Sequence, residues 1–240
     1  MHQLKHCALP VLLAGTLSFA VAPAQAATRN YIVTDFDTVR VEAPIAVGVQ
    51  TRRGVTARGE GDTDLLERIE LNVSGRILTV RLKPSPFEGR KSDQSVAARL
   101  FLTTPQLRRA NLSGSGTLAI SGMVGQNAEI VAAGSGAVTA AGIDADNFSV
   151  VLQGSASVTL VGKALKATFM SSGNGAIDGS ALTVSDLDVT AQGTGAIKAL
   201  ATRAAKVTAL GPAAVSVDGH PACTVRHAGG GMVSCGGEDF

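Results

Sequence analysis

Apolar and polar residues alternate along much of the chain with a period of two, which is typical of half-buried β-strands. From residue 111 to residue 235 a short turn triplet interrupts this alternation seven times. The triplets are Gly114-Ser115-Gly116, Gly134-Ser135-Gly136, Gly154-Ser155-Ala156, Gly173-Asn174-Gly175, Gly193-Thr194-Gly195, Gly211-Pro212-Ala213 and Gly229-Gly230-Gly231. The sequence numbers of successive first glycines differ by 20, 20, 19, 20, 18 and 18. A turn returning at this spacing predicts a solenoid, whose coils bury their apolar sides against one another.

Two columns of apolar residues flank the triplets. Four residues before each first glycine stand Ala110, Ile130, Val150, Phe169, Val189, Val207 and Val225. Four residues after it stand Leu118, Val138, Val158, Ile177, Ile197, Val215 and Val233. The residues one step beyond the second column are mostly polar, as Thr139 and Lys198 are. Each triplet therefore joins two strands that share one buried side.

Coils of about 18 to 20 residues are too short for a repeat that contains a helix, so the sequence predicts an all-β, right-handed parallel β-helix. Seven coils stacked about 4.8 Å apart would form a rod roughly 30 Å long. A glycine at each corner is suited to a positive φ angle or to a close approach of two backbones.

Residues 27–110 are also rich in β-signals but less regular. Alternating stretches predict strands over residues 36–41, 45–49, 69–73 and 78–82. Asp62 or Thr63 can cap a short helical turn, and the proline and glycine clusters between Lys83 and Gln94 mark a loop. This part is expected to form the first coils or a cap, because the end of a β-helix exposes open strand edges.

Residues 1–26 have the features of a secretory signal peptide. Lys5 precedes an apolar stretch from residue 8 to residue 22, and Ala24-Gln25-Ala26 is a small-x-small cleavage motif. Thr16 stands where a lipoprotein needs cysteine, so no lipid anchor is expected. No later run reaches 18 apolar residues, so no transmembrane segment is expected. We therefore expect a periplasmic or secreted protein. Its parts are the signal peptide (1–26), the cap (27–110), the regular solenoid (111–235) and a tail (236–240).

Charge differs between the two parts of the exported chain. Residues 28–110 contain 14 Lys and Arg against 10 Asp and Glu, whereas residues 111–240 contain 6 against 9. The sums of +4 and −3 nearly cancel, which argues against nucleic acid as a partner. Most arginines are scattered singly, which favours a solvated surface over an anion-binding patch.

The order of motifs along the chain resembles a known family. A Phe-Asp-x-Val-x-Val strand (36–41), an Asp-x-x-Leu-Leu-x-x-Ile segment (62–69), a Gly-x-Leu-x-Val strand near residue 75 and a Thr-Pro-x-Leu segment (104–107) precede the serial glycine corners. Together they resemble the putative auto-transporter adhesin, head GIN domain family over roughly residues 29–235. The resemblance implies a right-handed β-solenoid on an exported bacterial protein, with adhesion as the inferred role.

The residue pattern does not favour an enzyme or a bound cofactor. No acidic residue follows the triplets, which excludes calcium-binding solenoids of the glycine- and aspartate-rich type. Counted from the corners, the acidic residues of the coils fall at different positions: Asp144, Asp146, Asp178, Asp186 and Asp218. Residues 27–240 contain no Trp and a single Tyr, so stacking platforms for sugar rings are missing. Ser115, Ser135 and Ser155 stack, but no histidine lies in their coils to act as a base.

Cys223 and Cys235 are the two cysteines left after signal-peptide removal, and both belong to the last coil, with sequence numbers that differ by 12. In an oxidising compartment such a pair predicts a disulfide, here one that clamps the end of the rod. With His220 and His227 the same cysteines could instead form a tetrahedral zinc site. The spacing matches no established zinc pattern, so the disulfide is favoured.

Two functions fit these features. The first is a non-catalytic binding module, whose ladders of Ser113, Gln153, Ser172 and Gln192 would contact an envelope protein or a glycan. The second is an assembly protein that self-associates through the rod as a homo-oligomer. A polysaccharide-active enzyme is a distant third possibility.

Overall fold

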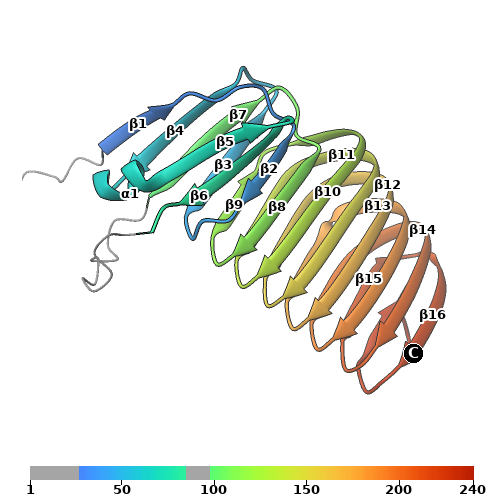
Figure 1. The fold of residues 1–240 in the computed structure, drawn as a ribbon. Helices are drawn as coiled ribbons and strands as arrows, with labels where there is room; N and C mark the ends of the chain where they lie inside the picture. The colour runs from blue at the N-terminus through green and yellow to red at the C-terminus, as the bar shows by residue number, and fades with distance from the viewer. Residues whose placement is uncertain (1–26, 85–97) are drawn as a thin grey trace, which may run out of the picture.

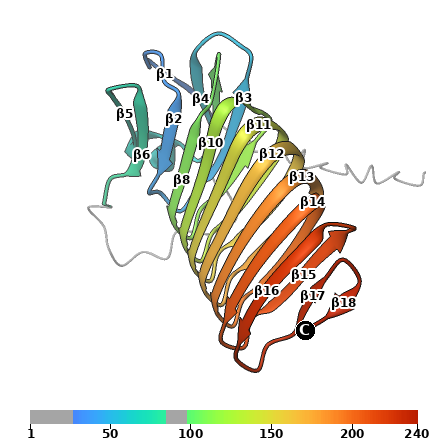
Figure 2. The ribbon, with the colours of Figure 1, turned by 90° about the vertical axis from the view of Figure 1, so that its right-hand side faces the viewer.

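The computed structural model describes residues 27–84 and 98–240, which form a β-solenoid built from one 18-stranded sheet (Figures 1 and 2). The predicted signal peptide and most of the predicted loop after Lys83 lie outside the described residues. The elements of the first part are β1 (Ala27–Tyr31), β2 (Thr38–Val41), β3 (Ala46–Thr51), β4 (Thr56–Gly61), α1 (Thr63–Arg68), β5 (Ile69–Ser74), β6 (Ile77–Leu82) and β7 (Arg99–Thr104).

The regular coils follow with longer strands that bend around the rod. They are β8 (Arg109–Gly114), β9 (Thr117–Ile120), β10 (Met123–Gly134), β11 (Ala137–Gly154), β12 (Ser157–Gly173), β13 (Ala176–Gly193), β14 (Ala196–Leu210), β15 (Ala214–Gly219), β16 (Ala222–Ala228), β17 (Val233–Cys235) and β18 (Glu238–Asp239). The parallel register pairs Gly114 with Gly134, Gly134 with Gly154 and Gly154 with Gly173. The hydrogen-bonded ladder therefore repeats once per coil, at the predicted coil length.

Two walls of the solenoid meet at the glycine corners. Wall A contains the strands that run up to the corners, which are β2, β8, the second halves of β10 to β14, and β16, and at its outer end also β6 and the antiparallel β5. Wall B contains the strands that leave the corners: β3, β7, β9, the first parts of β11 to β14, β15 and β17. The remaining stretches return the chain from wall B to wall A.

The first coils do not stack in the order of the sequence. Strand β2 lies between β6 and β8, and β3 lies between β7 and β9. The chain achieves this with antiparallel strands: β4 pairs with β7, β1 pairs with β4, and β5 pairs with β6. The first part thus supplies both early coils and a cap, and the cap covers one outer edge in each wall.

The first part contains a tight hairpin turn and the predicted helix cap. Gly75 and Arg76 have φ angles of 56° and 66°, so both central residues of the β5–β6 turn adopt the left-handed conformation of a type I′ hairpin. Asp62 caps α1, because its Oδ1 accepts the Leu65 N–H at 3.0 Å. The predicted strand over residues 36–41 begins later, at Thr38, although Phe36 is fully buried. The Phe36 carbonyl accepts the Thr104 hydroxyl instead of joining the ladder.

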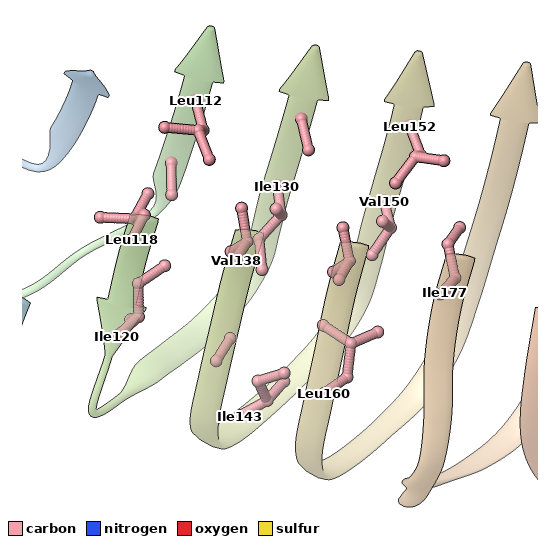
Figure 3. Packing of buried hydrophobic residues seen from close by; sticks show 14 of the residues in the cluster. Leu112, Leu118, Ile120, Ile130, Val138, Ile143, Val150, Leu152, Leu160 and Ile177 are labelled. Carbon is pink, nitrogen blue, oxygen red and sulfur yellow. The ribbon is translucent and has the colours of Figure 1, made fainter. Parts of the chain in front are cut away.

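Both predicted columns line the interior of the rod. Thirteen of their fourteen members are buried, and only Val225 in the last coil is half-buried. Figure 3 shows side chains of successive coils, among them Ile130, Val150 and Ile177, pointing into this common core. A third inward column, two residues before each first glycine, was not predicted: Leu112, Ala132, Leu152, Ser171, Ala191, Ala209 and His227. Because most of its members are small or polar, a search for large apolar residues does not detect this column.

The corners require glycine for two reasons. The first glycine of every triplet has a positive φ, from 92° at Gly154 to 151° at Gly229. The third residue, which is glycine in five of the seven triplets, lies directly over the preceding coil: a Cβ added at Gly195 would lie 2.2 Å from the Gly175 carbonyl oxygen. The backbone hydrogen bonds at the corners follow the same stacking, since the Ser135 and Gly136 N–H groups both donate to the Gly114 carbonyl.

Candidate functional site

The outer face of wall A carries the surface depressions from which a binding site could be built. Four depressions lie on this face: one over β5 and β6, one from β2 to β10, one from β2 to β12, and one from β12 to β16. A further depression lies at the C-terminal end of wall B, next to Met232 and Phe240. Figure 1 shows the successive strands of wall A side by side along the rod. The wall is therefore an extended surface rather than a single cleft.

The polar ladder expected from the sequence lies on this face. Gln153, Ser172 and Gln192 occupy matching positions on three adjacent coils, and all three side chains are exposed. Ser113 stands in the same column two coils before Gln153, with Ala133 between them. The structure thus brings the four residues into one line beside the corners.

An apolar stripe runs next to this ladder and was missed in the sequence. Val131, Val151 and Met170 occupy matching outward positions on adjacent coils. The two valines are half-buried and Met170 is 46% exposed. The signal was available, because Val151 and Met170 lie two positions before the ladder residues Gln153 and Ser172, and therefore on the same side of their strands.

Charged side chains of wall A pair across neighbouring coils. Arg81 Nε lies 2.7 Å from Glu42 Oε2, and Arg109 Nε lies 2.6 Å from Glu129 Oε2. Asp186 pairs with Arg203, and Asp188 Oδ2 lies 3.4 Å from Lys206 Nζ. All are solvent-exposed pairs, which contribute little to stability. Their main effect is that Glu42, Glu129, Asp186 and Asp188 already have partners.

Hydrogen bonds hold two carboxyl groups in the ionised form. The Arg81 guanidinium donates to Glu42 and lowers the pKa of that carboxyl. The Ser180 hydroxyl and backbone N–H donate to Asp178 Oδ1 and lower the pKa of Asp178 in the same way. Both shifts favour the charged state, so neither group is tuned to carry a proton near neutral pH, as a general acid would be.

The acidic residues of the coils are distributed over different sides of the rod. Asp144 lies on the return side, with its Oδ2 3.3 Å from Lys163 Nζ, whereas Asp178 follows a wall B strand and Asp186 lies on wall A. Within residues 27–84 and 98–240, no three His, Cys, Asp or Glu side chains gather to hold a metal ion. Because they lie on different sides, Asp144, Asp178 and Asp186 do not form paired carboxylates for acid and base work.

The corner serines lie along the ridge between the two walls. Ser115, Ser135 and Ser155 are exposed, and Ser155 Oγ donates to Asn174 Oδ1 at 2.9 Å. The two histidines of the exported chain lie elsewhere, His220 before β16 and His227 within it. One side-chain hydrogen bond thus links a corner serine to the next coil.

Cys223 and Cys235 form a disulfide, with Cα atoms 6.2 Å apart. Cys223 projects inward from β16 and Cys235 from β17, so the bond joins wall A to wall B across the last coil. The zinc alternative is wrong, because both sulfur atoms are bonded to each other. His227 is left with a buried Nε2 that has no hydrogen-bond partner among the described residues.

Comparisons with known proteins agree with this architecture. A putative adhesin from Bacteroides fragilis has a TM-score of 0.78 and 20% identity over 88% of this chain and 97% of that one. A putative lipid binding protein from Parabacteroides distasonis has a TM-score of 0.68 and 20% identity over the same shares. A putative adhesin from Parabacteroides merdae has a TM-score of 0.62 and 18% identity, over 88% of this chain and 96% of that one.

At these identities the solved structures establish the fold alone. No curated protein is similar to the chain in sequence. The described residues include no helix of the length and apolarity needed to cross a membrane. A family model covers residues 35–221, which is most of the solenoid and its cap. The chain therefore belongs to the family described as putative auto-transporter adhesin, head GIN domain.

Proposed function

We propose that the protein is an exported binding module of the bacterial envelope, and that the outer face of wall A is its binding surface. One observation carries the proposal: four depressions, the polar ladder and the apolar stripe all lie on this one face. A flat surface with alternating hydrogen-bonding and apolar columns suits an extended ligand that contacts several coils at once.

Export and a non-catalytic role belong to the same proposal. The predicted signal peptide and the disulfide both favour an oxidising compartment outside the cytoplasm. The family and two of the solved structures are described as putative adhesins, and adhesins are proteins that bind. On wall A the described carboxylates at Glu42, Glu129, Asp186 and Asp188 are in ion pairs, which favours binding over catalysis.

Substitutions on wall A should weaken binding. Residues 27–240 are immobilised and exposed to envelope extract, and the retained protein and carbohydrate are quantified. In the Ser172→Glu/Gln192→Glu variant two carboxylates replace neutral hydrogen-bonding groups of the polar ladder, so we expect about a tenfold loss of retained material. The matched variant Thr139→Glu/Ser157→Glu places the same charges on wall B and should retain the wild-type amount. Equal losses in both variants, or no retention by the wild type, would reject wall A as the binding face.

Self-association is a second candidate function, favoured by the C-terminal end of wall A. Among the described residues β16 pairs on one edge only, with β14, whereas β17 lies between β15 and β18. Figure 2 shows β16, β17 and β18 together at this end. An open strand edge above a half-buried Val225 is a template for another strand.

Light scattering of residues 27–240 over a range of concentrations tests this second candidate. If β16 recruits a second copy, the mean mass rises with concentration, and Val225→Lys restores the monomer by placing a charge at the edge. Thr208→Lys adds the same charge on the outer face one coil earlier and should leave the association unchanged. A constant monomer mass in the wild type would rule the candidate out.

A further inference from the structure

The depression between β2 and β12, here called the wall A groove, has a charge pattern that points to a ligand class. It has a volume of about 540 Å³ and crosses five adjacent coils. Asn127, Asn147 and Lys166 occupy matching positions on three of them, and Arg108 lies at the groove on the coil before. At about 4.8 Å per coil, the backbone positions of Arg108 and Lys166 are roughly 14 Å apart along the rod.

The groove is electropositive because its acids are neutralised and two of its cations are not. Asp37 Oδ2 accepts Arg76 Nε at 3.1 Å, and Asp37 Oδ1 accepts the Thr38 hydroxyl. Glu129 is paired with Arg109. Among the described residues Arg108 and Lys166 form no ion pair, and both side chains are exposed. A ligand in the groove therefore meets two available positive charges.

Amide and hydroxyl groups lie between these charges. Asn127 and Asn147 are exposed, and Asn147 Nδ2 donates to Asn127 Oδ1 at 3.2 Å. Ser149 and Thr168 add hydroxyl groups on the neighbouring column. Such groups form hydrogen bonds with hydroxylated ligands, and the cations add charge-assisted bonds to carboxylates.

The same surface disfavours two other ligands. The aromatic residue at the groove, Phe148, is buried, so a neutral glycan would find no ring for its sugar faces. A peptide strand gains most from pairing with an open sheet edge, whereas the groove crosses a face whose backbone groups already pair between coils.

We infer that the wall A groove binds an acidic polysaccharide laid along the rod, with its carboxylates at Arg108 and Lys166. This inference rests on the proposed function of wall A and names its ligand class. It also explains why the acids of the groove pair within the protein, because an unpaired carboxylate there would repel the ligand.

Calorimetric titration of residues 27–240 at low salt tests the inference with three acidic glycans: oligogalacturonate, oligoalginate and hyaluronate. At least one should bind, and affinity should fall as salt is raised. Arg108→Gln/Lys166→Gln should weaken binding by about tenfold or more, since it removes two charge-assisted contacts. Arg53→Gln/Lys198→Gln removes the same charge away from the groove and should change affinity less than about twofold. Both variants should melt like the wild type.

Two control ligands separate the alternatives. Methyl-esterified oligogalacturonate has the same sugar chain without charge and should bind far more weakly. Poly-L-glutamate that binds as tightly as the glycans would show that the groove selects negative charge alone, which would overturn the polysaccharide assignment. Failure of all three acidic glycans would also overturn it. If the Ser172→Glu/Gln192→Glu variant still lost envelope capture in that case, wall A would remain the binding face for another ligand.

Discussion

Val158→Asp should prevent the solenoid from folding. The Val158 side chain is 1% exposed and lies in the second apolar column, between Val138 and Ile177 of the neighbouring coils. A carboxylate there would be buried without a partner, an effect that costs more than about 4 kcal/mol when the charge cannot reach water. Since a typical domain is stable by about 5–15 kcal/mol, we expect little soluble protein and a loss of the β-sheet circular dichroism signal.

Ser157→Asp is the matched control, because it places the same charge one residue earlier on the exposed outer face. Its cross-coil neighbours are Ala137 and Ala176, so the new carboxylate meets no like charge directly opposite. The melting temperature should change by no more than a few degrees, as is usual for surface substitutions. A soluble Val158→Asp protein with wild-type melting behaviour would show that the column is not the core.

Removing the disulfide should lower the free energy of unfolding of the last coil by about 2–3 kcal/mol. Cys223→Ala/Cys235→Ala opens a bridge between residues whose sequence separation is 12, and short loops of this kind contribute a few kcal/mol. In a solenoid each coil contacts only its neighbours, so the loss should stay local. Amide hydrogen exchange in β16 and β17 should accelerate by about 30- to 150-fold, while β11 and β12 keep their protection.

Reduction of the wild-type protein with dithiothreitol should reproduce this pattern without any change of sequence. Faster exchange in the variant but not in the reduced wild type would point to the lost sulfur atoms rather than the bridge. Uniform acceleration along the whole rod would contradict local clamping and would mean that the coils unfold as one unit.

The regular coils were predictable because each repeat gives the same local signal. A glycine corner fixes the phase, and the apolar residues four positions away on either side then identify the buried face, as Ile130 and Val138 illustrate. The cysteine pair was predictable from its separation and the expected compartment. These inferences depend only on contacts between neighbouring coils. The repeat places equivalent residues in contact at every coil.

The cap and the candidate site required the structure. Nothing in the β2 sequence indicates that it packs between β6 and β8, because non-sequential pairing depends on the antiparallel strands β4 and β5. The sequence identified the polar ladder but not which other columns share its wall. The wall A groove also depends on ion pairs such as Arg109–Glu129, whose partners lie on neighbouring coils.

The stacking order of the first coils also sets how the chain can be assembled and lengthened. Because later segments enclose β2 and β3 on both sides, β2 has all its neighbours only once the chain is complete up to β8, and β3 only once it is complete up to β9. After β9 every coil is added to the one before it, in the order of synthesis. Whole coils can therefore be gained or lost between β9 and β16 without altering the cap or the disulfide-clamped end. The length of the rod, and with it the length of wall A, can therefore change in steps of one repeat.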